Sequence, residues 1–366
     1  MTSRRLIRIK VLQLLYAYSK KESATLAEIE RDLLKSMSKS TDLYYETLLL
    51  ITEVRRKAFQ KIDTARNRRF ASNVDLNPNT RFIDNPVFNI LENNKKFQYY
   101  ITNNLISWND NQETVLYFYN KLIEWSKYQK YMHQKSPSFE QHKQIVLDLF
   151  SELIIQDEMF YQTMEEKSIF WNDDFELVLS IVYKTLWHLQ EKMREEDDIL
   201  YPIYKKDEDF EYARTLMRKA FYEYNANMEI IDKFTYNWEL DRISEMDKLI
   251  MSCAISELKH FPSIPVKVTL DEYIEISKTY SSPKSGAFIN GVLDKAVALL
   301  KDTNEIVKAG RGLLDETEIC KGSGAGEAGA CGARPGGYYR KRSSYPGGAD
   351  DPESFQGRSG GRGCAV

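Results

Sequence analysis

Glycine is the residue that this chain most lacks. Only Gly286 and Gly291 occur among the first 308 residues, and the other fifteen follow from Gly310 onward. P-loop and Rossmann sites cradle phosphates with clustered glycines, so the scarcity excludes both from those 308 residues. It also indicates that the two glycines lie where nothing else fits. We expect Gly286 to turn the chain into a last helix and Gly291 to let that helix approach a neighbour closely.

Cysteine and histidine are also scarce. The first 308 residues hold one cysteine, Cys253, which cannot build a disulfide framework and is typical of a protein of the reducing cytoplasm. The four histidines are scattered, and none pairs with a cysteine or carboxylate at metal-ligand spacing. The acidic run 195–198 is interpreted as a solvated helix end. The sequence therefore predicts no catalytic residues, no metal and no cofactor. The four histidines are His133, His142, His188 and His260.

Long apolar runs are missing. No stretch of about 18 apolar residues occurs, so a membrane span is not expected. The N-terminal segment is basic and apolar, but Arg8, Lys10, Lys20 and Lys21 interrupt it. It has no uninterrupted apolar core and no small-residue cleavage site, which argues against a secretory signal.

Charge is present but unevenly distributed. The net charge is only −3, yet residues 1–69 hold 16 Lys and Arg against 8 Asp and Glu. Residues 148–211 show the opposite balance, with 18 acidic and 6 basic residues. A basic end can displace counterions from a nucleic-acid backbone, whereas the acidic middle would repel one. The alternative is two solvated helical surfaces of different sign.

Helical periodicity runs through nearly the whole chain and predicts an all-α fold. Apolar residues at helical spacing indicate helices over about 7–18, 26–37 and 42–66, which we expect to form an antiparallel N-terminal bundle over residues 1–66. Polar residues and prolines break the pattern at 67–86, and further helices follow within a helical insertion at 67–242. A C-terminal bundle is expected at 243–308. Within it, Thr269 and Glu272 have capping-box spacing for a helix that reaches about Tyr280, and a last helix covers about 285–300.

The C-terminal tail, residues 309–366, has a different composition. It is rich in Gly, Ser, Arg and Pro and holds too little apolar surface to offset the entropy of ordering, so it is expected to be disordered. Residues 338–342 combine two tyrosines with three cations, a combination that suits RNA. The alternative is an extension with no role.

Three arginines cluster at the N-terminus. At about 100° per residue, Arg4, Arg5 and Arg8 fall within an arc of roughly 100° beside the apolar stripe of the first helix. We expect their guanidinium groups to project toward a partner, because these groups grip phosphates in pairs and stack on bases. The alternative is a solvated helix end.

Two groups of short motifs carry a family resemblance. The first is RRLIR at 4–8 with QLLY at 13–16. The second runs from about Ile243 to Leu300 and comprises MDK at 246–248, AISEL at 254–258, IPVKV at 264–268, LDE at 270–272, EISK at 275–278 and FINGVLDK at 288–295. In order and spacing they resemble the NusB family of bacterial transcription antitermination factors. The long middle of the chain differs from the compact members of that family.

The resemblance implies a set of RNA-binding residues. They lie on the arginine helix and around the start of the last helix, where free amides favour phosphates. For Phe288 the resemblance implies stacking on an unpaired base, although a core aromatic is the alternative. Many family members carry a lysine where this chain has Ala287, so one phosphate contact is expected to be missing. The implied RNA-binding residues are Arg4, Arg5, Arg8, Gln13, Lys284, Phe288 and Asn290.

The resemblance also implies a function. The protein is expected to act in the cytoplasm without catalysis, binding single-stranded boxA-like RNA in nascent ribosomal RNA together with ribosomal protein NusE. The complex is expected to join the RNA polymerase elongation complex and suppress premature termination. The alternative is a helical protein-interaction scaffold that has the fold but does not bind RNA. NusB-like modules also occur fused to RNA cytosine methyltransferases, but those require a cofactor-binding α/β domain and a catalytic cysteine, which this chain lacks.

Overall fold

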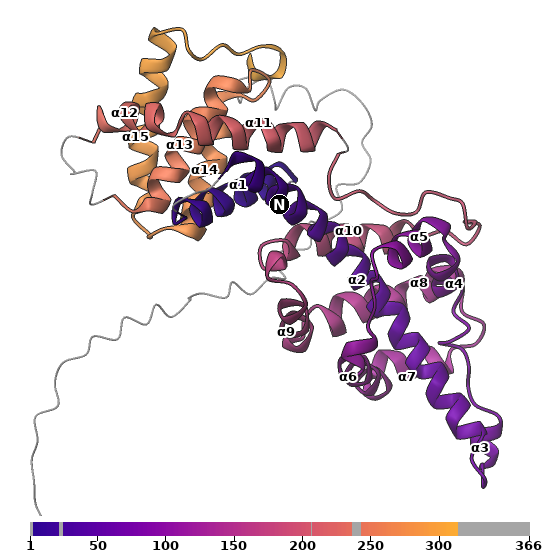
Figure 1. Ribbon diagram of the computed structural model, residues 1–366. Coiled ribbons are helices and arrows are strands. Elements are labelled where there is room, and N and C mark those ends of the chain that lie inside the picture. The colour runs from indigo at the N-terminus through magenta and orange to yellow at the C-terminus, as the bar shows by residue number, and fades with distance from the viewer. Residues whose placement is uncertain (1–2, 22–24, 206, 236–242, 314–366) are drawn as a thin grey trace, which may run out of the picture. The chain divides into compact units, whose positions relative to one another are not determined.

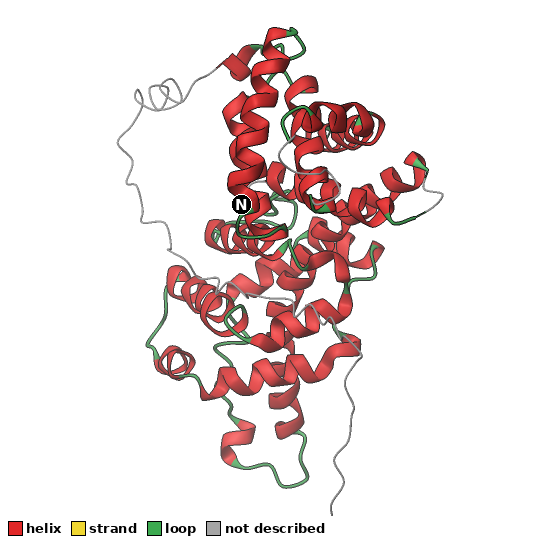
Figure 2. Ribbon diagram, turned by 90° about the vertical axis from the view of Figure 1, so that its left-hand side faces the viewer, coloured by secondary structure: helices red, strands yellow, loops and turns green. Residues whose placement is uncertain are grey.

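The fold of the described residues is entirely helical. The computed structural model describes residues 3–21, 25–205, 207–235 and 243–313. Within them no strand occurs, which confirms the all-α prediction (Figures 1 and 2). The α-helices are α1 Ser3–Ser19, α2 Leu26–Arg66, α3 Asn73–Leu76, α4 Pro86–Asn93, α5 Lys95–Asn103, α6 Gln112–Glu124, α7 Ser126–His133, α8 Phe139–Asp148, α9 Glu158–Lys167, α10 Phe175–His188, α11 Glu208–Tyr222, α12 Tyr224–Asp232, α13 Glu245–His260, α14 Val266–Tyr280 and α15 Ser285–Asp302.

A single helix, α2, occupies most of the N-terminal region. Thr25 and Glu28 form its capping box, and no glycine or proline interrupts the 41 residues that follow. The separate helices expected at 26–37 and 42–66 are therefore one helix, and the expected three-helix bundle is wrong. The polar stretch between them stays helical, and within it Ser38 Oγ donates to the carbonyl of Lys35 at 2.8 Å.

The middle of the chain packs around α2. Helices α4, α6 and α10 all contact it. Tyr100 stacks on Tyr45 with ring centroids 3.8 Å apart, and the indole N–H of Trp108 donates to the carbonyl of Glu46 at 3.0 Å. The part of the predicted insertion at 67–242 that follows α2 thus shares a core with it. The predicted domain boundaries themselves stay predictions.

The C-terminal helices form a second group of contacts, in which α13 packs against α11, α14 and α15 (Figure 1). Helix α14 ends and helix α15 begins close to the predicted positions. The start of α14 differs, because its N-cap is Pro265 and no side chain caps it. The capping-box prediction for Thr269 and Glu272 is therefore wrong. Thr269 lies inside the helix and bonds to Glu257, as described below.

Gly286 and Gly291 do not have the roles expected from the sequence. Both lie inside α15, and neither has a positive φ. A Cβ atom on Gly286 would be 3.5 Å from Ser277 Oγ, an ordinary contact, and one on Gly291 would meet nothing within 4 Å. The expected turn at Gly286 and close approach at Gly291 are therefore wrong. Neither backbone position requires glycine within the described structure.

Gly291→Ala is expected to raise the free energy of unfolding by about 0.5–1 kcal/mol, since glycine inside a helix costs about that much relative to alanine. The matched control is Gly312→Ala, whose Cβ would lie 1.9 Å from the backbone oxygen of Pro262. This control is expected to lower the stability. Chemical denaturation of both variants tests the prediction, and a destabilised Gly291→Ala variant would contradict it.

The last described residues pack on the end of α13. Lys308 Nζ donates to the carbonyl oxygens of Leu258 and Phe261, and the N–H of Ala309 donates to Pro262 at 3.0 Å. These bonds satisfy carbonyls that a helix end leaves open. Residues 309–313, the start of the tail that was expected to be disordered, therefore have a defined structure that includes η5, Gly310–Leu313. The rest of that tail lies outside the described residues.

Candidate nucleic-acid interface

Helix α1 carries the predicted arginines and packs against α2, α11 and α13. Its Arg8 side chain is only 3% exposed and grips the carboxylate of Glu257 on α13. Arg8 Nε lies 2.8 Å from Oε2 and Nη2 lies 2.8 Å from Oε1, a bidentate ion pair. The expectation that Arg8 projects toward a partner is thus wrong for this structure, because its guanidinium group is buried and occupied.

The Glu257 carboxylate has further hydrogen-bond donors. Thr269 Oγ1 donates to Oε1 at 2.8 Å, and the hydroxyl of Tyr212 donates to Oε2 at 2.5 Å. Burial alone would raise the pKa of Glu257. The charge of Arg8 and the hydrogen bonds from Arg8, Tyr212 and Thr269 outweigh burial and hold that pKa below its ordinary value. The carboxylate is therefore ionised at neutral pH and neutralises Arg8.

Arg4 also faces carboxylates. Its Nη2 lies 2.8 Å from Glu208 and its Nε lies 2.8 Å from Asp209, both at the start of α11. Its guanidinium carbon lies 4.1 Å from the centroid of the Tyr212 ring, a cation–π distance. Unlike Arg8, Arg4 keeps a partly exposed side chain.

Arg5 pairs with Glu272 on α14. Its Nε lies 2.6 Å from Oε2 and its Nη2 lies 3.0 Å from Oε1, and the side chain is partly exposed. The hydrogen bond with Glu272 raises the pKa of Arg5. The structure thus supplies every arginine of the predicted trio with a carboxylate from a distant helix. RNA binding by these residues stays a prediction.

Gln13 lies nearer to the second predicted site. Its side-chain amide donates to the carboxylate of Asp173 and lies 3.5 Å from the hydroxyl of Tyr280, the last residue of α14. The loop from α14 to α15 starts there. The structure therefore brings Gln13 close to the loop that holds Lys284.

The start of α15 holds the remaining predicted residues. Lys284 is exposed and has no ion pair with any described residue. Phe288 is half-buried and packs against the core, so both the stacking and the core interpretation retain support. The side-chain amide of Asn290 donates to Asp294 at 3.0 Å on the exposed side of the same helix. Ser285 Oγ donates to Asp247 at 3.0 Å, which fixes the start of α15 against α13.

The carboxylate partners of the arginines were not predicted from the sequence. Glu257 lies within the apolar stripe of α13 between Cys253 and Leu258, and a charge in such a stripe signals a buried partner. The sequence of α13 therefore contains a sign that Glu257 has a buried partner. Glu208 and Glu272, by contrast, occupy ordinary polar positions, and nothing in the local sequence marks them.

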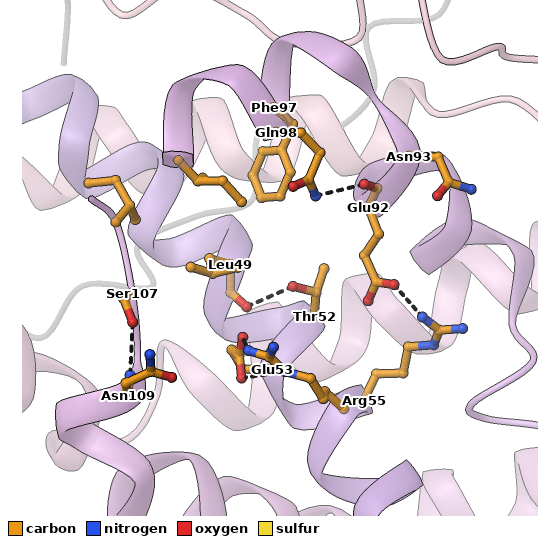
Figure 3. Close-up of a pocket in the computed structure, with 13 residues that line it drawn as sticks. Leu49, Thr52, Glu53, Arg55, Glu92, Asn93, Phe97, Gln98, Ser107 and Asn109 are labelled. Carbon is orange, nitrogen blue, oxygen red and sulfur yellow. Dashed lines mark hydrogen bonds and ion pairs between the residues drawn. The ribbon is translucent and has the colours of Figure 1, made fainter. Parts of the chain in front are cut away.

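A polar cavity of about 520 Å³ lies between α2, α4 and α5 (Figure 3). Its charged groups are already paired, because Arg55 binds Glu92 and Arg56 binds Glu53. Among the described residues, no group of three or more His, Cys, Asp or Glu side chains is placed to hold a metal ion. No helix in that part of the chain is long and apolar enough to cross a membrane.

Comparisons with known proteins agree on one family. The family model described as the NusB family matches residues 175–298, the range from α10 into α15. A curated relative from Salinibacter ruber, "Transcription antitermination protein NusB", is 36% identical over 149 residues, which are 39% of this chain and 93% of the relative. A relative of the same name from Dictyoglomus turgidum is 40% identical over 106 residues, 29% of this chain and 72% of the relative. A solved NusB structure from T. maritima is 24% identical and covers 45% of this chain and 93% of its own, with a TM-score of 0.24, at which the likeness supports no structural argument.

Proposed function

We propose, because this chain belongs to the NusB family, that it is a transcription antitermination factor that binds boxA-like single-stranded RNA together with ribosomal protein NusE. In this proposal the complex joins the elongating RNA polymerase on nascent ribosomal RNA, and the protein acts by recognition and tethering rather than catalysis. The observation that carries it is the relative that is 36% identical and is covered over 93% of its length.

The ion pairs of α1 divide the proposed roles of its arginines. Arg4 and Arg5 keep partly exposed side chains, and the pair of Arg4 with the exposed Glu208 contributes only about 0–1 kcal/mol. An RNA phosphate can therefore replace Glu208 on Arg4 while the buried Asp209 stays paired. On Arg5 it can bind beside Glu272, which also lies 3.6 Å from Arg8. Arg8 is buried with its carboxylate and is unsuited to this exchange. We assign Arg8 the positioning of α1 and assign Arg4 and Arg5 to phosphate.

Lys284 is the second proposed phosphate contact. It is exposed, it precedes the first turn of α15, and no described carboxylate neutralises it. Phosphates favour the start of a helix, where backbone amides point outward. Phe288 lies one turn further along α15 and keeps part of its ring accessible. A base next to the bound phosphate can stack on that part of the ring.

RNA affinity in the presence of NusE is expected to fall as salt rises, with a log–log slope corresponding to about two to five phosphate contacts. Lys284→Gln is expected to reduce that slope by roughly one contact. Lys295→Gln, an exposed lysine of the same helix, is the matched control and should leave the slope unchanged. Fluorescence anisotropy of a boxA RNA over a salt series measures both variants.

A protein-interaction scaffold without RNA binding is the second candidate. The observation that favours it is the carboxylate on every arginine of α1, which removes much of the positive charge expected there. Binding of NusE with no RNA affinity at any salt concentration would establish the scaffold. Salt-dependent RNA affinity that rises when NusE is added would exclude it.

A further inference from the structure

Four cations without an ion pair among the described residues cluster at the end of α2. We define the α2 tip as residues 59–70, the last two turns of α2 and the four residues after it. It holds four basic residues and one acidic residue, Asp63. All four cations are exposed, and none forms an ion pair within the described residues. They are Lys61, Arg66, Arg68 and Arg69.

Two exposed phenylalanines accompany these cations. Phe59 is 56% exposed and Phe70 is 87% exposed. Phe59 and Arg66 are seven residues apart, so they share one face of the helix two turns from each other. The guanidinium carbon of Arg69 lies 5.6 Å from the centroid of the Phe70 ring. Two exposed aromatic rings therefore flank the four cations of the α2 tip in the sequence.

Helix stability accounts for only part of this arrangement. A cation in the last turn favours the negative end of a helix, which explains Arg66. It does not explain the exposed rings, which keep more than half of their contact with water on folding and so gain little from burial. The short helix α3 contacts α2 near its C-terminal end (Figure 1). Both rings nevertheless stay exposed. Single-stranded nucleic acids use this combination, because bases stack on rings while phosphates meet cations.

We propose that the α2 tip binds single-stranded RNA without regard to sequence. The surface lies outside residues 175–298, the range that the family model matches, and is distinct from Lys284. The proposal rests on the proposed function only in taking RNA, rather than single-stranded DNA, as the ligand. It requires neither the boxA element nor NusE. The surface would hold the RNA that flanks the recognised element.

The test uses the full chain and two probes that lack boxA, a 30-nucleotide oligo(U) RNA and the matching oligo(dT) DNA. One variant carries Lys61→Gln, Arg66→Gln, Arg68→Gln and Arg69→Gln. Each phosphate contact contributes about 0.7 to the salt slope for a single strand, so four contacts contribute about 3. We expect the variant to lose about that much slope on oligo(U) and to bind about 100-fold more weakly at 0.1 M salt.

A control with the same loss of charge carries Lys130→Gln, Lys135→Gln, Lys192→Gln and Arg194→Gln, all exposed and without ion pairs among the described residues. It should bind oligo(U) nearly as the parent protein does. Phe70→Ala should weaken binding by about 5- to 150-fold with the salt slope unchanged. Thermal unfolding of each variant verifies that the fold is intact, as expected for exposed positions.

Three outcomes would overturn the proposal: no binding of oligo(U) by the parent protein, an equal loss in the control and the α2-tip variant, or no effect of Phe70→Ala. The last would indicate a surface for any polyanion, such as an anionic membrane or an acidic protein. Tighter binding of oligo(dT) than of oligo(U) would refute RNA as the ligand. Failure of boxA binding with NusE would refute the proposed function and leave this result standing.

Discussion

Arg8→Ala is expected to lower the free energy of unfolding by about 3–5 kcal/mol, because it leaves the fully buried carboxylate of Glu257 without its counter-charge. Tyr212 and Thr269 would still donate hydrogen bonds, but neither carries a charge. Urea denaturation at pH 7 measures the loss. Arg5→Ala removes a partly exposed pair and is the control, with an expected loss of about 0–1 kcal/mol.

A double substitution separates the ion pair from simple packing. Arg8→Met alone keeps most of the volume but leaves Glu257 unpaired, whereas Arg8→Met with Glu257→Leu removes both charges and should recover most of the stability that Arg8→Met loses. Equal losses in the Arg8→Met variant and the double variant would show that an unpaired charge does not cause the effect.

The pH dependence of the Arg8→Ala variant follows from Glu257. In the parent protein the pKa of Glu257 is lowered, so its contribution is present above the ordinary value of 4.5 and is lost as pH falls through the folded pKa. Without Arg8, burial dominates and raises that pKa. The cost of burying the ionised, unpaired carboxylate of Glu257 is then greatest at high pH and shrinks as pH falls. The stability difference between parent and variant should be larger at pH 8 than at pH 5.

Lys10→Met is expected to cost a similar amount, about 3–5 kcal/mol, at a second buried pair. Lys10 Nζ lies 2.8 Å from Oδ1 of Asp174 and donates to Oδ2 at 3.1 Å. Both side chains are buried. Methionine fills the same space but leaves the carboxylate unpaired. Lys278→Met, at an exposed lysine that pairs with the exposed Glu275, is the control and should cost about 0–1 kcal/mol.

Asp174 gives this second pair the opposite pH dependence in the parent protein. Burial raises the pKa of Asp174, and Lys10 offsets this only in part. A raised carboxyl pKa gives stability that is full below the ordinary value of 3.8 and is lost as pH rises through the folded pKa. Removing Lys10 should raise the pKa of Asp174 further, so the loss of stability should continue to higher pH. A deficit in Lys10→Met that does not grow between pH 5 and pH 8 would contradict this assignment.

The sequence predicted those helix ends that depend on residues next to them in the chain. Ser138 starts α8 with a capping box directly after the expected break at Pro137, and α15 begins at the predicted Ser285. Continuity of α2 was missed because Ser38 and its polar neighbours weaken a helical pattern without ending a helix. The start of α14 was missed because capping-box spacing also occurs inside helices, and at Thr269 the side chain is used for a tertiary bond.

The candidate site was less predictable for the same physical reason. The positions of Arg4, Arg5 and Arg8 on one side of α1 follow from helix geometry. Their exposure depends on carboxylates that lie more than 200 residues away in the chain, and no local pattern encodes such pairs. The sequence locates these charges on α1 but does not determine which carboxylates neutralise them.

The distance in sequence between Arg8 and Glu257 has a consequence for synthesis. The two residues are 249 positions apart. At about 5–20 residues per second, a ribosome needs roughly 12–50 s to reach Glu257 after making Arg8. Throughout that interval Arg8 lacks its counter-charge and α1 lacks α13 to pack against, so the apolar side of α1, with Ile7 and Val11, lacks part of its cover. Helix α1 is made long before α13 and completes its packing only once α13 is present, and in the meantime part of its apolar side is available to chaperones.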